Sequence, residues 1–246
     1  MGLRPAWEAC CAVVDGLFSR RNWLAWGVLL GSLGVVLLAW QTLRNNQHAA
    51  ATAQFALLAD ELSQTLDERM TDHERILLAA AGLFDASQEV SRDDWKAFIQ
   101  RLQLGERYPG IQGVGFAERV PGAERSRFEA RVRAEGFADF SIRPPGAREP
   151  LSAIVYLEPF TGRNLAAFGF DMLTESTRRQ AMLAAAESGT TRLSGKVTLV
   201  QETHGQVQPG LLMYVPVYRS ATPPKTPEER LQALRGPVYR PYRVPD

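Results

Sequence analysis

WLAWGVLLGSLGVVLLAWQTL, residues 23–43, decides how the rest of this chain is interpreted. The run carries no charged side chain, and a helix of its length spans roughly 30 Å, about the thickness of the hydrocarbon core of a bilayer. Trp23, Trp26 and Trp40 lie near its ends, where indole rings suit the interface between membrane and water. We therefore expect one transmembrane helix, with residues 44–246 forming a domain tethered to the membrane.

The charges that flank this run predict its orientation. Arg20 and Arg21 precede it closely, whereas Arg44 alone follows it closely. Because Lys and Arg favour the cytoplasmic side, we expect residues 1–22 to be a cytoplasmic tail. The domain then lies in the periplasm, as in a single-pass protein of a bacterial inner membrane. A cleaved signal peptide is the alternative, since Ala51-Thr52-Ala53 has the pattern of a cleavage site, and it also places the domain outside.

The charge balance and the cysteines of the chain indicate which partners it can bind and what can stabilise its fold. The chain has 28 basic and 27 acidic residues, a balance that gives no indication of nucleic-acid binding. Its two cysteines, Cys10 and Cys11, are adjacent and precede the apolar run. Small apolar filler is one interpretation of this pair, and a lipidated or metal-binding pair is the other. The exported part has no cysteine and must be held together by its core.

A long helix is predicted to continue out of the membrane, because residues 35–81 contain neither proline nor glycine. We expect a periplasmic stalk helix over residues 44–90. Its apolar stripe either packs on its own domain or pairs with a second copy of the chain, and we expect a homodimer through this stalk. The stripe recurs at helical spacing and consists of Phe55, Leu58, Leu62, Leu66, Met70, Leu77 and Phe84.

Caps, turns and apolar runs divide residues 91–246 into short elements. Ser91 with Asp94, Thr174, and Thr226 before Pro227 have the pattern of helix starts, and Gly189 that of a helix end. Gly113 and Gly115 within an apolar strand suggest close approach of another backbone. We expect helices at 91–104, 122–135, 175–187 and from 226, and strands at 111–120, 140–142, 153–157, 190–193, 197–201, 211–218 and around 238. This order predicts an α+β domain with an antiparallel sheet.

Motifs for catalysis and metal binding are sparse. His48, His73 and His204 lack the spacing of metal ligands, and we expect no metal site, no cofactor and no nucleophile motif. Glu158 and Asp171 lie at the ends of apolar segments, so a membrane-tethered hydrolase that uses this pair of carboxylates is one hypothesis. A binding pocket is better supported, because Tyr156, Glu158, Asn164, Phe168 and Asp171 combine aromatic walls with a few polar groups, which is typical of ligand sites.

Several stretches resemble the CHASE domain family. They are YPGIQGVGFAERVP (108–121), FEARVRAEGFADFSI (128–142), IVYLEPFTGRNLAAFGFDM (154–172), RRQAMLAAAESG (178–189), LSGKVTLVQE (193–202) and PGLLMYVPVY (209–218). The resemblance covers residues 75–243 in order. It implies an extracytoplasmic sensor of bacterial or plant receptors, with a long N-terminal helix and PAS-like antiparallel-sheet lobes between two membrane helices. The output is typically a histidine kinase, a diguanylate cyclase or a phosphodiesterase.

The resemblance also implies a small-molecule site in the sensor domain. Plant members bind cytokinins, and the aspartate that holds the adenine falls at Gly162 here, while a pocket threonine falls at Ser194. We expect a pocket walled by Tyr156, Phe168, Phe170 and Tyr214, with Glu158, Asn164, Asp171 and Ser194 orienting the ligand. We expect residues 91–246 to be a C-terminally incomplete CHASE-like domain without an enzymatic output. A module that only dimerises is a further hypothesis.

Overall fold

The computed structural model describes residues 23–107, 112–200, 209–220, 222 and 224–243. The expected cytoplasmic tail, which contains both cysteines, lies outside the described residues, as do His204 and the side chain of His48. The chain divides into two compact units, Met1–Glu68 and Arg69–Asp246.

Helix α2, Trp23–Asp85, is continuous, as expected from the absence of helix breakers, and it ends five residues before residue 90. Among the described residues it is the helix that is long and apolar enough to cross a membrane, with a mean hydropathy of 1.9 over its best window. None of that window is buried against protein. A signal sequence near an N-terminus meets the same criteria of length and composition.

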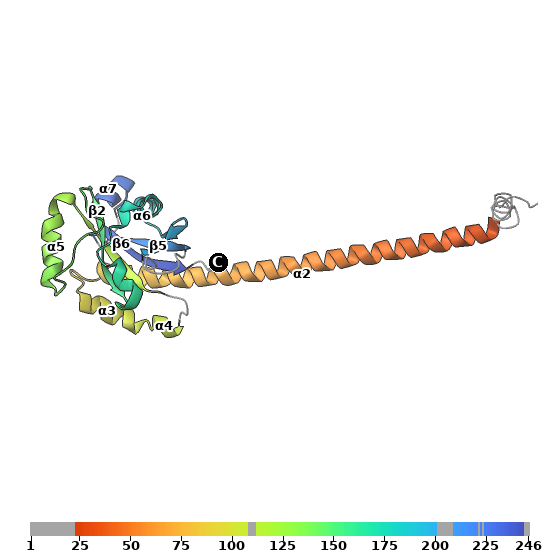
Figure 1. The fold of residues 1–246 in the computed structure, drawn as a ribbon, viewed down its shortest axis with the longest axis horizontal. Coiled ribbons are helices and arrows are strands. Elements are labelled where there is room, and N and C mark those ends of the chain that lie inside the picture. The colour runs from red at the N-terminus through yellow and green to blue at the C-terminus, as the bar shows by residue number, and fades with distance from the viewer. Residues whose placement is uncertain (1–22, 108–111, 201–208, 221, 223, 244–246) are drawn as a thin grey trace, which may run out of the picture. The chain divides into compact units, whose positions relative to one another are not determined.

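The second unit is built on one antiparallel sheet (Figure 1). The strand order is β2-β1-β6-β5-β3, and β4 also pairs with β5. The α+β class with an antiparallel sheet is therefore confirmed. The resemblance implies more than one lobe, whereas the described strands all belong to this one sheet. The strands are β1 (Val114–Val120), β2 (Leu151–Glu158), β3 (Arg192–Leu193), β4 (Val197–Thr198), β5 (Pro209–Tyr218) and β6 (Leu234–Arg243).

Side chains alternate between the two faces of the sheet along each strand, so both faces carry apolar side chains. Helices cover both of these faces. One core forms where the end of α2 packs with α3 (Arg92–Arg101), α4 (Leu104–Arg107) and α5 (Arg125–Ala134). The second core forms under α6 (Ser176–Ser188), on the opposite face. Helix α7 (Pro227–Ala233) lies beside α6 (Figure 1). The α2 residues in the first core have helical spacing and are Ile76, Leu77, Ala80, Ala81 and Phe84.

Two of the three predicted helix starts are confirmed. Ser91 and Asp94 form a reciprocal capping box at α3, and Thr226 forms one with Glu229 at α7. The prediction for α6 is wrong by one residue. The carboxylate of Glu175 accepts hydrogen bonds from the backbone N–H groups of residues 177 and 178, so Glu175 is the cap. The hydroxyl of Thr174 instead donates to the carbonyl of residue 171.

Other boundaries differ because local turns replace regular elements. The predicted strand at 140–142 is wrong, since only the next residue, Arg143, makes an isolated bridge, to Phe170. The helix expected at 122–135 begins with a 3-10 turn, η1 (Gly122–Glu124). Close backbone approach at the strand glycines is confirmed. A Cβ on Gly113 would lie 2.7 Å from the carbonyl oxygen of Glu158.

Candidate functional site

The four aromatic residues expected to wall one pocket lie on two faces of the sheet. Tyr156 and Phe168 pack against the core under α2 and α3, whereas Phe170 and Tyr214 pack in the core under α6. The backbone of Gly169 has φ +81°, a left-handed conformation that turns the chain between the two phenylalanines. The expected single aromatic wall is therefore divided between two regions of the domain.

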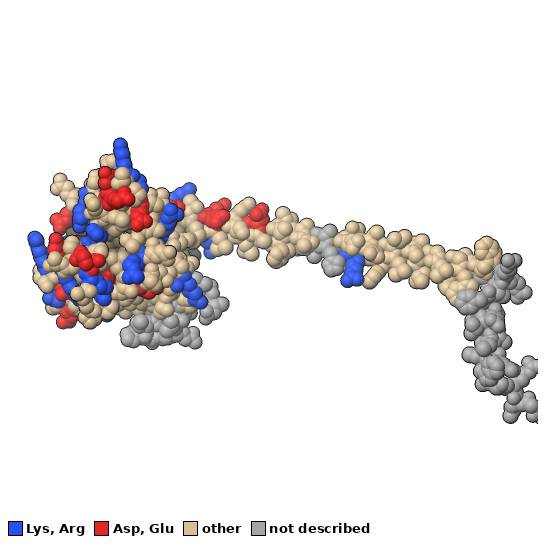
Figure 2. Space-filling model, turned by 90° about the horizontal axis from the view of Figure 1, so that it is seen from above, with Lys and Arg blue, Asp and Glu red and all other residues tan. Residues whose placement is uncertain are grey.

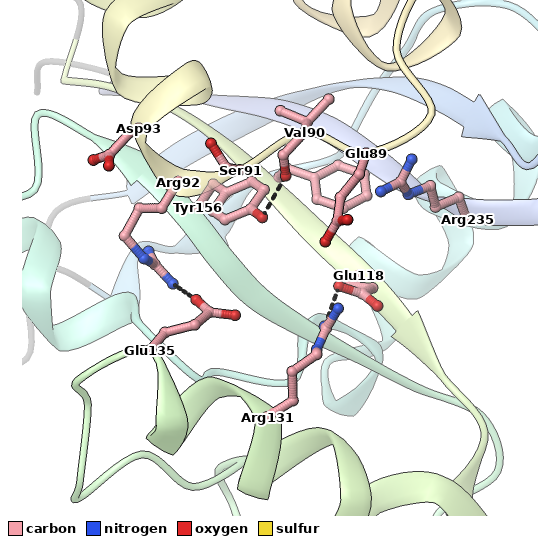
Figure 3. A pocket seen from close by; sticks show the side chains of 11 residues that line it. Glu89, Val90, Ser91, Arg92, Asp93, Glu118, Arg131, Glu135, Tyr156 and Arg235 are labelled. Atoms are coloured by element: carbon pink, nitrogen blue, oxygen red, sulfur yellow. Dashed lines mark hydrogen bonds and ion pairs between the residues drawn. The ribbon is translucent and has the colours of Figure 1, made fainter.

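Tyr156 lies at the first region, a surface pocket of about 500 Å³ (Figure 3). Its hydroxyl donates to the carbonyl of Val90 at 2.8 Å, and its ring stacks on Trp95 with centroids 5.9 Å apart. These contacts join β2 to the segment between α2 and α3. Burial raises the pKa of the Tyr156 phenol, so the hydroxyl remains a donor.

Ion pairs neutralise much of the charge around this pocket. Arg92 pairs with Glu135 at 3.0 Å, and Arg131 pairs with Glu118 at 2.7 Å, as the dashed lines in Figure 3 show. Arg92 also donates to the carbonyl of residue 155 at 2.8 Å, which fixes its guanidinium between α3 and β2. The pairs connect α3 and β1 to α5, so they stabilise the arrangement of these elements.

Phe168 is part of an aromatic cluster in the same half of the domain. Its ring centroid lies 4.9 Å from that of Phe137, 4.8 Å from that of Phe140 and 5.2 Å from that of Phe160. The Arg92 guanidinium carbon lies 5.3 Å from the Phe168 ring centroid. These contacts assign Phe168 to the packing of the loop that follows β2.

Asp171 is fully buried and is bonded to the domain through both carboxylate oxygens. Oδ1 accepts from the backbone N–H of Ser152 at 2.9 Å and of Leu173 at 3.1 Å. Oδ2 accepts from Nε of Arg148 at 3.0 Å. The carboxylate therefore holds β2, the turn after Phe170 and a loop arginine in place.

The other predicted polar residues also bond to the backbone. The Asn164 amide donates to the carbonyls of Gln112 and Pro159 at 3.0 and 2.9 Å. The Ser194 hydroxyl accepts from the N–H of Leu212 at 2.9 Å and donates to the carbonyl of the next residue. Glu158 accepts from the N–H of residue 160 at 3.2 Å. Thus the structure gives each predicted polar residue at least one backbone partner.

Under α6 lies a polar group in which the sequence alone singles out Tyr214 but neither Arg178 nor Tyr239. Arg178 of α6, Tyr214 of β5 and Tyr239 of β6 are 3%, 0% and 1% exposed and lie within or beside an otherwise apolar core. Tyr214 and Tyr239 face each other directly across β5 and β6, with ring centroids 6.5 Å apart. The Arg178 guanidinium carbon lies 5.0 Å from the ring centroid of Phe170.

The polar atoms of this group have few partners. Among the described residues, Nε of Arg178 and the hydroxyls of Tyr214 and Tyr239 have no hydrogen-bond partner. Nη2 of Arg178 donates to the carbonyl of Thr198. Burial raises the pKa of both phenols and lowers that of Arg178, and each phenol lies close enough to the guanidinium to affect its charge. The arrangement presents a cation and two hydroxyls in a low-dielectric interior.

The described residues contain no metal centre, and the face shown in Figure 2 is not dominated by one sign of charge. Its residues contain no cluster of three or more His, Cys, Asp or Glu side chains that could hold a metal ion. Basic and acidic side chains are mixed over the visible face of the second unit (Figure 2). Buried polar side chains with unpartnered atoms, which include the group under α6 and Arg240 on the other face of the sheet, are therefore the more distinctive chemistry of the described residues.

Fold and site together define an α+β domain with one antiparallel sheet whose α6 face holds buried polar side chains. The CHASE domain family matches residues 88–246, and the chain belongs to that family. This match confirms the resemblance seen in the sequence. CHASE domains are extracytoplasmic sensor modules, which gives the domain a sensory role at the level of the family. No curated protein matches the chain.

Proposed function

We propose that this chain is a membrane-anchored sensory module that binds a small molecule in the periplasm and passes the signal toward a cytoplasmic output. The observation that carries the proposal is the buried polar group of Arg178, Tyr214 and Tyr239 inside the domain that matches CHASE. Buried polar atoms in native proteins are nearly always hydrogen-bonded, and the exceptions concentrate at functional sites. The buried interior under α6 is therefore the place where we expect the ligand to bind.

The predicted site residues enter this proposal in different roles. Phe170 and Tyr214 lie in the core under α6 and can contact a ligand there. Asp171, Asn164, Ser194 and Glu158 position the surrounding backbone. Tyr156 and Phe168 belong to the opposite core, where Tyr156 bonds to Val90 in the segment that follows α2 and Phe168 lies beside Arg92 at the start of α3. We propose that these two report the state of the sheet to the long helix.

The proposed anchoring and topology are supported by α2 and by the charges in the sequence that flank its apolar run. The uncharged residues 23–43, with arginines before them, support a single-pass anchor in a bacterial inner membrane with the sensor domain outside. We propose that the domain is PAS-like, on the basis of its antiparallel sheet with helices on both faces. Recognition rather than catalysis is proposed because Asp171 is fully buried and engaged by backbone N–H groups, which does not suit one of two catalytic carboxylates.

A screen of the full-length chain in detergent or nanodiscs tests the proposal. Libraries of small metabolites, including acids, amines, sugars and adenine derivatives, are tested for an increase in Tm, and hits are measured by calorimetry. We expect at least one class of compound to raise Tm by several degrees, because a ligand that binds only the folded state stabilises it. If no compound in any class binds, the sensory proposal fails, and a module that only dimerises becomes the better hypothesis.

A further inference from the structure

We infer that the molecule bound under α6 is an organic acid whose carboxylate is held by Arg178, Tyr214 and Tyr239. This inference rests on the proposed function, since it names the class of ligand for the same site. It is drawn from the side chains of this chain, and its strongest element is a buried arginine that lacks a carboxylate partner among the described residues.

Arg178 has its charge inside the protein and only part of its hydrogen bonding satisfied. The side chain is 3% exposed, and its Nη2 donates to a backbone carbonyl of residue 198. The nearby carboxylate of Glu175 accepts from two backbone N–H groups at the start of α6, at 2.9 and 2.8 Å. Its charge favours the protonated guanidinium, but the two side chains form no direct ion pair. A buried guanidinium is costly unless it is paired, and carboxylate is the planar acceptor that it pairs with best.

The two tyrosines add neutral donors to the same place. Tyr214 and Tyr239 lie on the α6 face of adjacent strands, and neither hydroxyl has a partner among the described residues. The other three tyrosines in the described part of the chain, Tyr156, Tyr218 and Tyr242, each have a hydrogen-bond partner for the hydroxyl. The hydroxyl of Tyr218 donates to the carbonyl of residue 186 at 2.7 Å, and that of Tyr156 donates to residue 90 at 2.8 Å. The high pKa of buried phenols keeps both hydroxyls protonated, so they can donate at any physiological pH.

One cation and two hydroxyl donors together select the charge and shape of the ligand. A carboxylate can accept from Nε and from both hydroxyls at once, and its negative charge compensates the guanidinium. A cationic ligand would be repelled by Arg178, and an apolar one would leave all three donors unsatisfied. Because these atoms are buried, an acid reaches them only if α6 or its neighbours move, which couples binding to a conformational change.

The experiment compares acids with their amides on the full-length chain in nanodiscs. The probes are acetate, succinate, benzoate and phenylacetate, each with its uncharged amide, together with any hit from the metabolite screen. We expect an acid to raise Tm and to bind by calorimetry, and its amide to bind at least tenfold more weakly. Arg178→Gln should abolish this binding. Arg179→Gln is the matched control, because Arg179 is the next residue of α6 and is exposed, and it should bind as the wild type does.

Tyr214→Phe and Tyr239→Phe give a second test, because they should affect the stability of the unliganded protein and its affinity for the acid in opposite directions. Each removes a buried hydroxyl without a partner among the described residues, so the Tm of the unliganded protein should stay equal or rise. The same changes should weaken binding of the acid roughly 5- to 10-fold each. These variants keep the inference testable even if Arg178→Gln does not fold.

Several outcomes would overturn the inference and leave the sensory function intact. They are a neutral or cationic ligand whose affinity is unchanged in Arg178→Gln, an acid that binds equally well to the Tyr→Phe variants, and a clear loss of unliganded Tm in those variants. The last result would show that the hydroxyls are satisfied within the protein or by bound water. Failure of every compound class, in contrast, would remove the sensory function itself.

Discussion

At the scale of single residues, the stability of the domain depends on a few positions. At some of them a larger side chain would clash, and at others the side chain makes hydrogen bonds that another residue cannot replace. Gly115 on β1 is the clearest steric case. A Cβ built on it would lie 2.6 and 2.7 Å from two ring carbons of Tyr239 and 2.8 Å from the carbonyl oxygen of Tyr156. Glycine therefore allows β1 to run close to both β2 and the central strand β6.

Gly115→Ala should destabilise the protein by about 1–3 kcal/mol, because Tyr239 and the β2 backbone must both shift to accept a methyl group. For a unit of this size that corresponds to a Tm lower by roughly 2–12 °C. Gly82→Ala is the control, since no atom lies within 4 Å of a Cβ there, and alanine should raise Tm slightly in the helix α2. Equal Tm values for the two variants would contradict the packing described for β1.

Asp171 is the clearest electrostatic case at the same scale. Asp171→Asn should cost roughly 1–3 kcal/mol, because the amide cannot accept from Ser152, Leu173 and Arg148 with the same charge and geometry. Chemical denaturation of the full-length protein measures this loss. Glu158→Gln serves for comparison and should change stability by less, since Glu158 accepts one backbone bond at 3.2 Å. A stable Asp171→Asn protein would argue against a structural role.

At the scale of elements, two contacts make the fold sensitive to pH. The first joins α5 to the segment before β2. Glu129 accepts from Arg125 and from the N–H of Ile142, each at 3.0 Å. Burial opposes its charge, but these bonds and the nearby arginines outweigh burial and lower its pKa.

The lowered pKa of Glu129 determines the pH range in which it stabilises the domain. Its contribution is complete above the unfolded-state pKa, which is near 4.5, and is lost as the pH falls through the lower pKa of the folded state. Glu129→Gln should therefore lower Tm at pH 7, and the difference from wild type should shrink on acidification below about 4.5. A difference that is constant between pH 7 and 3 would contradict this role.

The second pH-sensitive contact joins α2 to β6. Burial, followed by the charge of Arg240, lowers the pKa of His73 to about 4, and its ring lies 5.4 Å from that of Tyr242. As the pH falls below 6.5 the unfolded state takes up a proton that the folded state does not, so stability decreases until about pH 4. His73→Gln should flatten the dependence of Tm on pH between 7 and 4. A profile parallel to that of wild type would contradict the depressed pKa.

At the scale of the whole molecule, the exposed stripe of α2 supports the proposed homodimer. Within the first unit, Phe55, Leu58, Leu62 and Leu66 are 74%, 51%, 66% and 62% exposed. Large apolar side chains at helical spacing are typical of a surface that pairs with another helix. We propose that the partner is the same stripe of a second copy of the chain, because two copies anchored in one membrane would hold their stalks side by side.

A cysteine placed on this stripe tests the dimer in membranes. Cys10 and Cys11 are first replaced by serine, and Leu62→Cys in that background should form a disulfide-linked dimer on mild oxidation. Glu61→Cys is the control, because it is adjacent in sequence but lies off the stripe. Leu58→Asp combined with Leu62→Cys should reduce cross-linking several-fold. Equal cross-linking at positions 61 and 62 would indicate random collision rather than a helix pair.

Much of the fold follows from local sequence signals, and the site does not. The cap at Ser91, the cap at Thr226 and the end of α6 at Gly189 depend on neighbouring residues, so sequence alone identifies them. The polar group under α6 depends on strand register, which brings Tyr214 opposite Tyr239, and on the face of α6 that carries Arg178. The only local hint was Tyr214. The turn at Gly169 has the opposite effect, because it separates Phe168 from Phe170, two residues that look equivalent in sequence.

The alternation of side chains along β6 has a mechanical consequence. Tyr239 faces the core under α6, while its neighbour Arg240 lies on the other side of the sheet, with its guanidinium carbon 4.5 Å from the ring centroid of Tyr242. Arg240 also affects the charge of His73 on α2. Only one peptide bond thus separates Tyr239, which we propose contacts the ligand, from Arg240, which lies on the α2 side of the sheet. A twist of this one central strand would therefore move side chains on both faces of the sheet at the same time.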